Sequence, residues 1–279
     1  MPLYLAYDGS VNGDWVARYA ICLAGHTPLR HLHTINVDTG EFTGDWLRAK
    51  LDRIEEECRA AEVTIDVDSV PVRESVEASL AETVVPGPDS LLICGTRLRS
   101  GQRGYLSGTI SEKLLAWHGS NVVAIRVVQP GLLGAPHDVL LPLLGPPKES
   151  PTPLTFVQWL APGIRRLHIL RAIQVGHGAF RRLTRQQLSK FRRDGFLFAQ
   201  EIEKQLIEKT VLMDRVIDAG VRVTDDWAKD TIIYASRHKS QLICLEAPFP
   251  TTTTRLFRAD PIERLLADAP CDVALFRGA

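Results

Sequence analysis

The stretch that decides the fold is LLICGTRLRSGQRGYLSGTIS, residues 91–111. Its apolar run Leu91–Cys94 is typical of a buried strand, Gly95 opens a loop with glycines and arginines, and Gly108 and Thr109 lead into a helical pattern. Glycines let a backbone approach a ligand closely, and the first turn of a helix favours an anion. The order therefore predicts a phosphate site, although a surface connection with useful arginines would explain the same residues.

Strand and helix patterns alternate around this stretch. In the first half we expect strands at Leu3–Tyr7, Leu29–Val37, Val63–Val72, Leu91–Cys94 and Val122–Val128, and helices over Trp15–Leu23, Phe42–Ala60, Glu74–Val84 and Thr109–His118. Strands joined by helices of this length pair in parallel through right-handed crossovers. The pattern predicts a doubly wound α/β fold with a parallel sheet.

The same order returns after a linker rich in proline and glycine, Gln129–Pro136. The expected strands are Val139–Leu143, Arg166–Ile173, one that begins at Val221–Val223, Gln241–Leu245 and Val273–Phe276, and the expected helices are Ser150–Leu160, Gln200–Ala219, Trp227–Ser236 and Ile262–Ala267. An internal repeat of about 130 residues with one insertion explains this order. We therefore expect two tandem domains, residues 1–130 and 136–279.

Composition restricts the class of protein. The first 134 residues hold 12 Lys and Arg against 17 Asp and Glu, a net charge of −5, and the rest holds 21 against 16, a net charge of +5. The total is zero, so the overall charge predicts no nucleic-acid partner. No apolar run approaches the roughly 20 residues of a membrane span, and the first residues do not resemble a signal peptide. Five scattered cysteines suggest reduced, buried thiols in a cytoplasmic protein.

Four segments carry a family resemblance. They are LYLAYDGSVNGDWVARYAICLA (residues 3–24), CGTRLRSGQRGYLSGTISEKLLAWHGSNVVAIRV (94–127), DVLLPLLGPPKESPTPLTFVQWLA (138–161) and PIERLLADAPCDVALFR (261–277). In these segments and in the order of elements, the chain resembles the tandem two-domain form of the universal stress protein family. The resemblance implies two five-stranded parallel sheets of order 3-2-1-4-5, of the adenine-nucleotide alpha-hydrolase-like kind. It also implies a stress-response protein.

Some members of this family bind ATP through an aspartate after strand 1 and a glycine motif, G-x2-G-x9-G-(S/T), after strand 4. The positions that match in the first domain are Asp8, Val37, Gly95, Gly108, Thr109 and Ser111. The second glycine of the motif is replaced by Leu98, which could crowd the phosphates. Strands 1 and 4 flank the switch point of such a sheet, where ligands bind, so the resemblance implies ATP, with or without Mg²⁺, in the first domain.

Each candidate residue also has a structural role to be weighed. Asp8 would hold ribose or Mg²⁺, or else cap the first helix. Backbone N–H groups of Gly108, Thr109 and Ile110 would hold phosphate, with hydroxyls of Thr109 and Ser111 as further donors, while Thr109 is also a natural N-cap. The loop arginines Arg97, Arg99 and Arg103 would pair with phosphate oxygens or remain solvated.

The second domain has lost these features. Leu144 stands where the aspartate is expected, and the segment LEAPFPTTTTRLFRADPIERLL, residues 245–266, has no glycine. We expect no ATP there. The resemblance implies that the two halves pair through Val122–Val128 and Val273–Phe276 as an intramolecular pseudo-dimer, and it leaves further association into a homodimer open.

Other candidate sites are weaker. His31 and His33 share one face of a strand, but no third ligand follows at a telling distance, so we predict no metal site. No Ser/His/Asp order, catalytic carboxylate pair or HExxH motif is present. The expected function is therefore binding and signalling and not turnover, although a slow ATPase activity stays compatible with the sequence.

A basic insertion offers a second hypothesis. Residues 165–193 contain nine Lys and Arg and no Asp or Glu, with RRLTRQQLSKFRR at 181–193 as an amphipathic helical pattern. Such a helix can dock on nucleic acid, an anionic membrane or an acidic partner, or it can be solvated or face the acidic first half. The alternative function is thus a binding module that acts through this insertion.

Overall fold

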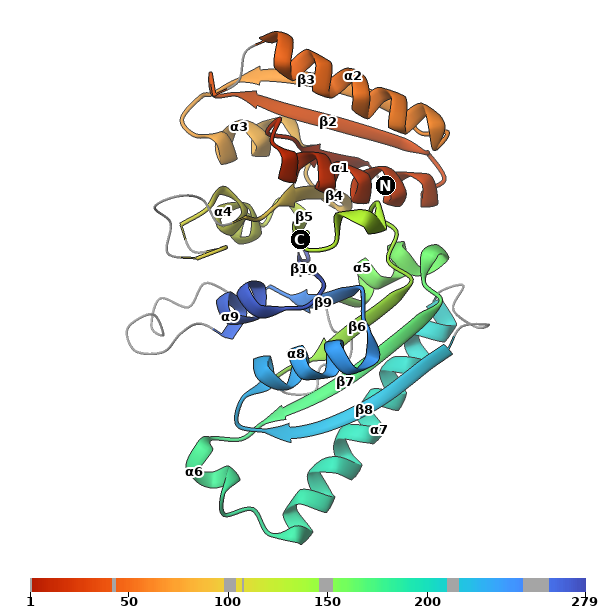
Figure 1. Cartoon of the computed structure of the whole chain (residues 1–279), viewed down its shortest axis with the longest axis vertical. Coiled ribbons are helices and arrows are strands. Elements are labelled where there is room, and N and C mark those ends of the chain that lie inside the picture. Colours follow the sequence, from red (N-terminus) through yellow and green to blue (C-terminus); the bar gives the residue numbers. More distant parts are fainter. Residues whose placement is uncertain are drawn as a thin grey trace. The chain divides into compact units, whose positions relative to one another are not determined.

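The computed structural model describes residues 2–41, 44–97, 104–106, 108–145, 153–209, 216–247 and 261–279. The chain divides into two compact units. The first contains Met1–Ala135, Ala247–Pro250 and the end of the chain, Ala274–Ala279; the second contains Pro136–Glu246 and Thr251–Val273. Figure 1 shows the elements along the chain.

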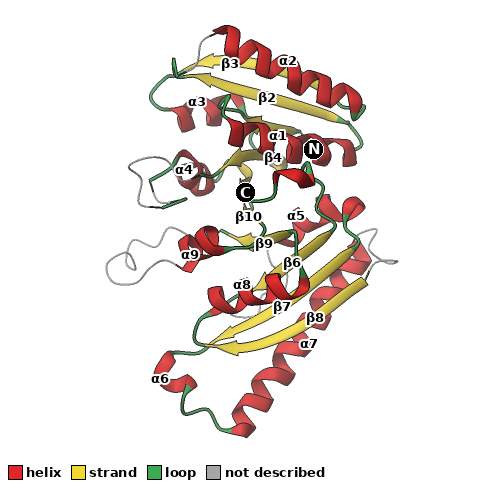
Figure 2. Cartoon of the chain, in the orientation of Figure 1, coloured by secondary structure: helices red, strands yellow, loops and turns green. Residues whose placement is uncertain are grey.

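The first unit is an alternation of strands and helices, seen as yellow arrows and red coils in Figure 2. Its elements are β1 Leu3–Ala6, α1 Val11–His26, β2 His31–Asp38, α2 Gly44–Ala60, β3 Thr64–Pro71, α3 Val76–Thr83, β4 Gly87–Gly95, α4 Ile110–Ala116, β5 Ser120–Arg126 and the short helix η1 Pro130–Leu132. The strands pair in parallel in the order β3-β2-β1-β4-β5, which is the predicted order 3-2-1-4-5.

Helices cover both faces of this sheet. Right-handed crossovers place α1 and α2, which pack together, on one face and α3 and α4 on the other (Figure 1). The strands β4 and β5 have long fully buried apolar runs, as expected for parallel strands covered on both faces. All carboxyl ends of the parallel strands meet at one edge, where the chain leaves β1, β2 and β4.

The second unit repeats this order. Its elements are β6 Asp138–Leu143, α5 Pro153–Leu160, η2 Ala161–Gly163, β7 Arg166–Gln174, α6 His177–Phe180, α7 Arg185–Lys209, β8 Val216–Thr224, α8 Trp227–His238, β9 Leu242–Glu246 and α9 Pro261–Asp268. Its strand order is β8-β7-β6-β9, again with parallel pairs. The last strand, β10 Asp272–Arg277, has its first two residues in this unit and the others in the first unit.

The last strand, β10, is not part of the second unit alone. Residues Ala274–Ala279 group with the first unit, and β10 follows β5 in the strand order. All six residues of β10 are buried. Two independent five-stranded domains divided at the linker therefore do not describe the chain completely.

The helix predicted over Gln200–Ala219 is wrong at its end, because Val216–Ala219 begin the strand β8. The helix α7 instead starts at Arg185 and ends at Lys209. The basic segment 181–193 is therefore not a separate insertion helix. It forms the turn after α6 and the first part of α7, which connects β7 to β8 as α2 connects β2 to β3.

Among the described residues, no helix is both long enough and apolar enough to cross a membrane.

Candidate functional site

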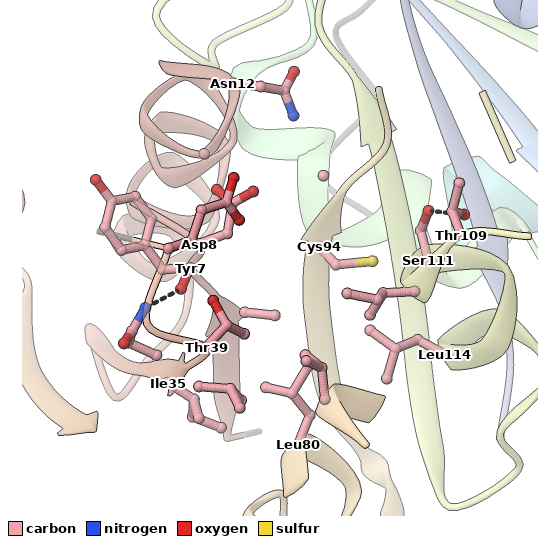
Figure 3. Close-up of a pocket in the computed structure, with 18 of the residues that line it drawn as sticks. Tyr7, Asp8, Asn12, Ile35, Thr39, Leu80, Cys94, Thr109, Ser111 and Leu114 are labelled. Atoms are coloured by element: carbon pink, nitrogen blue, oxygen red, sulfur yellow. Dashed lines mark hydrogen bonds between the residues drawn. The ribbon is translucent and has the colours of Figure 1, made fainter. Parts of the chain in front are cut away.

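A cavity of about 430 Å³ opens at the carboxyl ends of the first unit's strands (Figure 3). This volume lies within the range of roughly 300–1,000 Å³ that is usual for small-molecule sites. All eight site residues predicted from the sequence line it: Asp8, Val37, Gly95, Arg97, Gly108, Thr109, Ile110 and Ser111. The fold thus brings together positions from four separate segments of the chain. The other predicted loop residues, Leu98, Arg99 and Arg103, lie outside the described residues.

Asp8 and Arg97 form an ion pair in the lining of the cavity. A guanidinium nitrogen of Arg97 donates to Asp8 Oδ2 at 3.2 Å, and Asp8 Oδ1 accepts from the backbone N–H (3.1 Å) and hydroxyl (2.6 Å) of Ser10. Ser10, and not Asp8, is the N-cap of α1, since its hydroxyl accepts from Gly13 N–H. Asp8 is therefore not used as the helix cap, and a ligand can compete for its pairing with Arg97.

Two glycines allow close approaches near Asp8. A Cβ at Gly95 would lie 2.6 Å from the side-chain nitrogen of Asn12, and a Cβ at Gly13 would lie 2.6 Å from Asp8 Oδ1. A side chain at either position would therefore displace the end of Asn12 or of Asp8, which both line the cavity. The first turn of α1 can thus lie close to the end of β4 and form one wall of the cavity.

The first turn of α4 has the N-cap that was one of the two roles expected of Thr109, together with a contact of Glu112 that the sequence did not reveal. Thr109 is the N-cap, with its hydroxyl accepting from Glu112 N–H at 3.1 Å. The carboxylate of Glu112 reaches back to the N–H of Gly108 at 2.6 Å, and Gly108 has a φ of +74°. This resembles the capping box, in which a threonine and a glutamate three residues later satisfy the free N–H groups of a helix start.

Some of the predicted phosphate donors are therefore engaged within the protein. The Thr109 hydroxyl donates to the Leu106 carbonyl and shares a 2.8 Å hydrogen bond with Ser111, and Thr109 N–H donates to the same carbonyl. The backbone N–H groups of Ile110 and Ser111 belong to the first turn, whose N–H groups have no partner inside a helix. These two are the best-placed amides for an anion in the cavity.

The opposite wall of the cavity is apolar. Ile35 and Val37 of β2, Leu80 of α3, Cys94 of β4 and Leu114 of α4 line it (Figure 3). Burial raises the pKa of the Cys94 thiol to about 12, so this cysteine stays a protonated, apolar group. The cavity therefore has one polar end at Asp8 and Arg97 and one apolar wall.

Tyr7 contributes a buried polar support beside Asp8. Its hydroxyl donates to Asp14 Oδ1 at 2.6 Å, and Asp14 also forms an ion pair with Lys50. The side chain of Asn36 donates to the Tyr7 carbonyl at 2.8 Å and ties the end of β1 to β2. These contacts fix the loop that presents Asp8.

Several lining residues were missed from the sequence. Tyr7, Asn12, Gly13, Thr39 and Cys94 all line the cavity. A signal existed for Asn12 and Gly13, because the N-cap at Ser10 places them in the first turn of a helix that starts at the binding edge. Thr39 follows directly after β2, where a lining residue is equally expected.

The residues present fit a nucleoside better than they fit a ready-made triphosphate site. The apolar wall suits a purine ring, and Asp8 suits ribose hydroxyls or a metal ion that accompanies phosphate. At the phosphate end, Arg97 is paired with Asp8 and Gly108 N–H is bonded to Glu112. Phosphate would have to displace both contacts.

In the second unit, an arginine side chain binds the loop that follows β6, the counterpart of the loop that contains Asp8. Arg171 of β7 is buried, and its guanidinium donates to the carbonyls of Leu143 at 3.0 Å and Gly145 at 2.6 Å. Burial lowers its pKa. Leu144 lies between the two carbonyls in the sequence, where the first unit has Asp8. Most of the predicted glycine-free segment of this unit lies outside the described residues.

Beside His31 and His33 lies Asp66, which belongs to the neighbouring strand β3. It is a third potential metal ligand that the sequence did not reveal.

The basic segment is exposed. The side chains of Arg181, Arg182, Arg185, Lys190, Arg192 and Arg193 are all exposed. Among these six side chains, as far as the structure describes them, Arg193 forms an ion pair with its neighbour Asp194, at 3.9 Å. Phe196 and Leu197 follow on the same helix with 44% and 60% of their surface exposed.

The chain is similar to known proteins in its fold. No protein-family model and no curated protein sequence matches it. Solved structures match its whole length at low identity. A universal stress protein from Archaeoglobus fulgidus is 14% identical, with a TM-score of 0.61, and the match covers 100% of this chain and 96% of that one.

Two further structures are similar to the same extent. A putative universal stress protein from Pseudomonas aeruginosa is 12% identical with a TM-score of 0.59, covering 100% of this chain and 94% of that one. The cytoplasmic domain of a prokaryotic cation chloride cotransporter is 12% identical with a TM-score of 0.58, covering 99% and 95%. At these identities the likeness shows the fold.

Proposed function

The chain has the fold of the universal stress proteins, and on this premise we propose that its first unit binds an adenine nucleotide, ATP or a relative of it. We further propose that the protein acts in a stress response through binding and signalling. The observation that carries the proposal is the cavity at the switch point of the first sheet. Eight residues predicted from the sequence line it, although Asp8 and Gly95 are 87 positions apart.

The apolar wall and the polar end of the cavity would bind different parts of the nucleotide. The apolar wall of Ile35, Val37, Leu80, Cys94 and Leu114 would hold the purine ring. Asp8 would bind the ribose or a phosphate-bound Mg²⁺. Arg97 and the N–H groups of Ile110 and Ser111 would hold phosphate oxygens, since charge-assisted bonds from arginine are the strong ones.

We propose binding without efficient turnover, and the groups that line the cavity support this. The Cys94 thiol is kept protonated by burial, and Asp8 is engaged by Arg97 and Ser10. We place this function in a reducing compartment such as the cytoplasm, because none of the five cysteines forms a disulfide. We also propose that the two halves act together as an intramolecular pseudo-dimer.

The test is a thermal unfolding scan with and without Mg-ATP, paired with chromatography of any nucleotide that the denatured protein releases. A ligand at 100-fold over its Kd stabilises by about 2.7 kcal/mol, which is roughly 5 to 10 °C for domains of this size. We expect this shift in the native protein and its loss in Asp8→Ala and Gly108→Val. Asp52→Ala, which removes an exposed acidic side chain of α2 outside the cavity, should keep it.

Two results would count against the nucleotide. The first is an absent shift together with an absence of released nucleotide. The second is a shift that survives in both cavity variants, because the ligand would then bind elsewhere. A parallel scan with adenosine separates the two ends of the cavity, since adenosine needs the apolar wall and Asp8 but not Arg97.

A second candidate function is favoured by the exposure of the basic segment. Six exposed cations, of which Arg185, Lys190, Arg192 and Arg193 lie on α7, precede two exposed apolar residues of the same helix, Phe196 and Leu197. This is the composition with which helices dock on anionic surfaces. On this proposal the protein is a binding module that acts through α7, with or without nucleotide.

This candidate is tested by sedimentation with anionic vesicles and with RNA at low and high salt. Binding should weaken with salt and be lost when Arg181, Arg182, Arg192 and Arg193 are changed to Gln. The matched control changes four exposed arginines of the first unit to Gln: Arg48, Arg53, Arg59 and Arg73. Equal behaviour of the two quadruple variants would show that total charge, and not α7, determines the interaction.

A further inference from the structure

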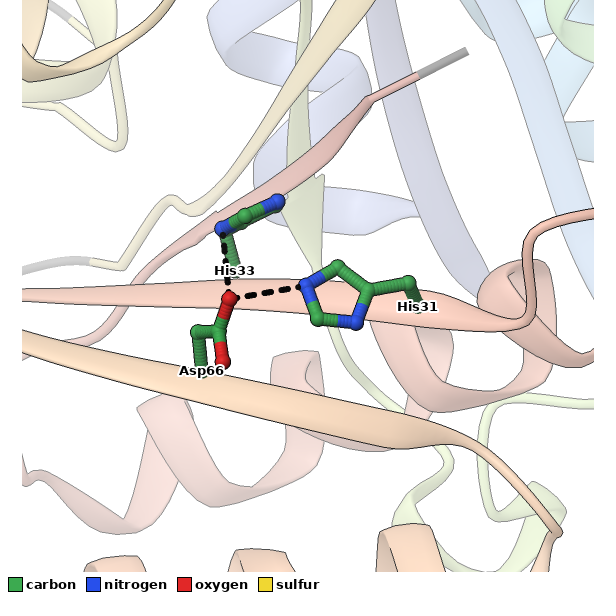
Figure 4. A group of neighbouring side chains, drawn as sticks. All are labelled: His31, His33 and Asp66. Carbon is green, nitrogen blue, oxygen red and sulfur yellow. Dashed lines mark hydrogen bonds and ion pairs between the residues drawn. The ribbon is translucent and has the colours of Figure 1, made fainter.

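A cluster of two histidines and an aspartate lies at the end of β2 opposite to the cavity. His31 and His33 are at the beginning of β2, whereas the cavity is lined by residues from the other end of this strand, Ile35 onward. Asp66 Oδ2 lies 3.1 Å from His31 Nε2 and 3.6 Å from His33 Nδ1 (Figure 4). One carboxylate oxygen is thus shared by two imidazoles.

The strand geometry fixes this arrangement. His31 and His33 are two residues apart, so they lie on the same face of β2. His33 is the register partner of Asp66 on β3, the edge strand of the first unit. The His33 ring is also stacked on Tyr4, with ring centroids 5.1 Å apart. The donors are therefore held by the sheet and not by a loop.

Thr64 orients the ring of His31. Its hydroxyl lies 2.7 Å from His31 Nδ1 and 3.1 Å from the carbonyl of Arg30. In the tautomer that has its proton on Nδ1, the hydroxyl accepts this proton and donates to the Arg30 carbonyl, and Nε2 has a lone pair. This lone pair then faces Asp66 Oδ2 at 3.1 Å, and this is the tautomer that can bind a metal ion through Nε2.

A metal cation fits this cluster better than a bound proton does. Neutral imidazole is the form that binds metal ions. A proton can join only one nitrogen to the carboxylate, whereas a metal ion can engage both nitrogens and the oxygen at once.

We propose that His31, His33 and Asp66 bind one divalent cation of the zinc class. Imidazole and carboxylate are zinc ligands, with metal–ligand distances near 2.0–2.1 Å, so neighbouring ligands of a tetrahedral ion lie about 3.3 Å apart. The distances of 3.1 and 3.6 Å bracket this value.

Mg²⁺ is a poor match for this cluster, because it prefers oxygen ligands. Water completes the coordination, since the Asp66 side chain is 63% exposed. The ion joins β2 to the edge strand β3.

The second unit contains a related group that serves as a comparison. His168 and Asp218 are register partners on β7 and β8, as His33 and Asp66 are on β2 and β3. The position two residues before His168 is Arg166 and not a histidine, and the third member, His238, comes from α8. The His168–Asp218 distance is 3.5 Å, and His168 is buried.

The test is a calorimetric titration of untagged protein with ZnCl₂, together with the visible spectrum of the Co²⁺-loaded protein. We expect one ion per chain at this cluster, loss of binding in His31→Gln and Asp66→Asn, and no competition from excess Mg²⁺. Thr64→Val removes only the hydroxyl that orients His31, so it should weaken zinc binding by about 10- to 100-fold. Circular dichroism checks that each variant is folded, which is expected because the cluster lies at the surface.

The control variant is His238→Gln, which removes an imidazole from the second group and should leave this binding unchanged. Loss of zinc in His238→Gln with retention in His31→Gln would overturn the proposal by placing the ion in the second unit. The absence of saturable zinc binding, or equal binding in all variants, would overturn it as well.

Discussion

Tyr7 shows how the surroundings of one residue support the cavity. Its phenol is 2% exposed and donates to Asp14, whose other oxygen pairs with Lys50. Burial, and then the Asp14 carboxylate, raise the pKa of Tyr7 well above its ordinary value of about 10. The folded state therefore holds the phenolic proton more strongly than the unfolded chain does.

A pH dependence follows for this residue. Below about pH 10 both states keep the proton, and the contribution of Tyr7 to stability is complete. Above that pH the unfolded chain loses the proton first, so the free energy of unfolding falls by up to about 1.4 kcal/mol per pH unit. Urea unfolding between pH 9 and 11 should show this decline in the native protein and a smaller one in Tyr7→Phe. Identical slopes would mean that the Tyr7 proton is no better held in the folded state.

At the scale of elements, the start of α4 is capped by a carboxylate of the same helix, that of Glu112. The carboxylate of Glu112 lies on Gly108 N–H at 2.6 Å, on the side of the helix start where phosphate is proposed to bind. A phosphate group must replace or approach this carboxylate. Glu112 thus stabilises the helix start and opposes an anion at the same place.

Glu112→Gln should strengthen phosphate binding. Glutamine keeps the length of the side chain and the capping arrangement, but it removes one negative charge next to the proposed phosphate position. We expect roughly fivefold tighter binding of ATP from the lost repulsion, with the affinity for adenosine unchanged. Calorimetry with both ligands measures this. An equal change for adenosine and ATP would show that the substitution altered the cavity itself.

The elements also show what the sequence could reveal. Val216–Ala219 were assigned to a helix because they follow the helical pattern of Gln200 and its neighbours, yet they alternate with the strand period into Val221 and Val223. The basic pattern at 181–193 looked separate because a helix was expected to start only at Gln200. In fact one helix runs from Arg185 to Lys209. Local periodicity does not say where two neighbouring patterns join.

Contacts between strands explain the residues that were missed at the sites. The residues of the cavity could be predicted because the carboxyl ends of parallel strands meet at one edge. Asp66 could not, since it is 33 positions from His33 and joins it only through the register of β2 and β3. Glu112 was overlooked because its capping contact lies within the loop that was interpreted as a phosphate site.

On the scale of the whole molecule, the end of the chain completes the first unit. Leu275 and Phe276 are fully buried, and Arg277 contacts His118 at 2.8 Å while Ala279 N–H donates to Asn121 at 3.3 Å. The strand β5 therefore depends on residues far away in the sequence. A fragment cut at the linker would lack them.

Deletion of Ala274–Ala279 should destabilise the first unit. Two large apolar side chains at roughly 1.5–3 kcal/mol each give a loss of about 3 to 6 kcal/mol. Hydrogen exchange of β4 and β5 measures it within the first unit. Deletion of Gly278 and Ala279 alone removes neither apolar side chain and should cost about 1 kcal/mol or less. Equal protection in the long deletion and the full chain would contradict the role of β10.

This feature has a consequence for how the protein is made. Residues 1–135 leave the ribosome well before residues 274–279 are synthesised. The nascent first unit therefore lacks its last strand until the whole second unit has been made. During that time the free edge of β5 is open to pairing with other chains. A premature stop codon anywhere in the second half would leave that edge permanently uncovered.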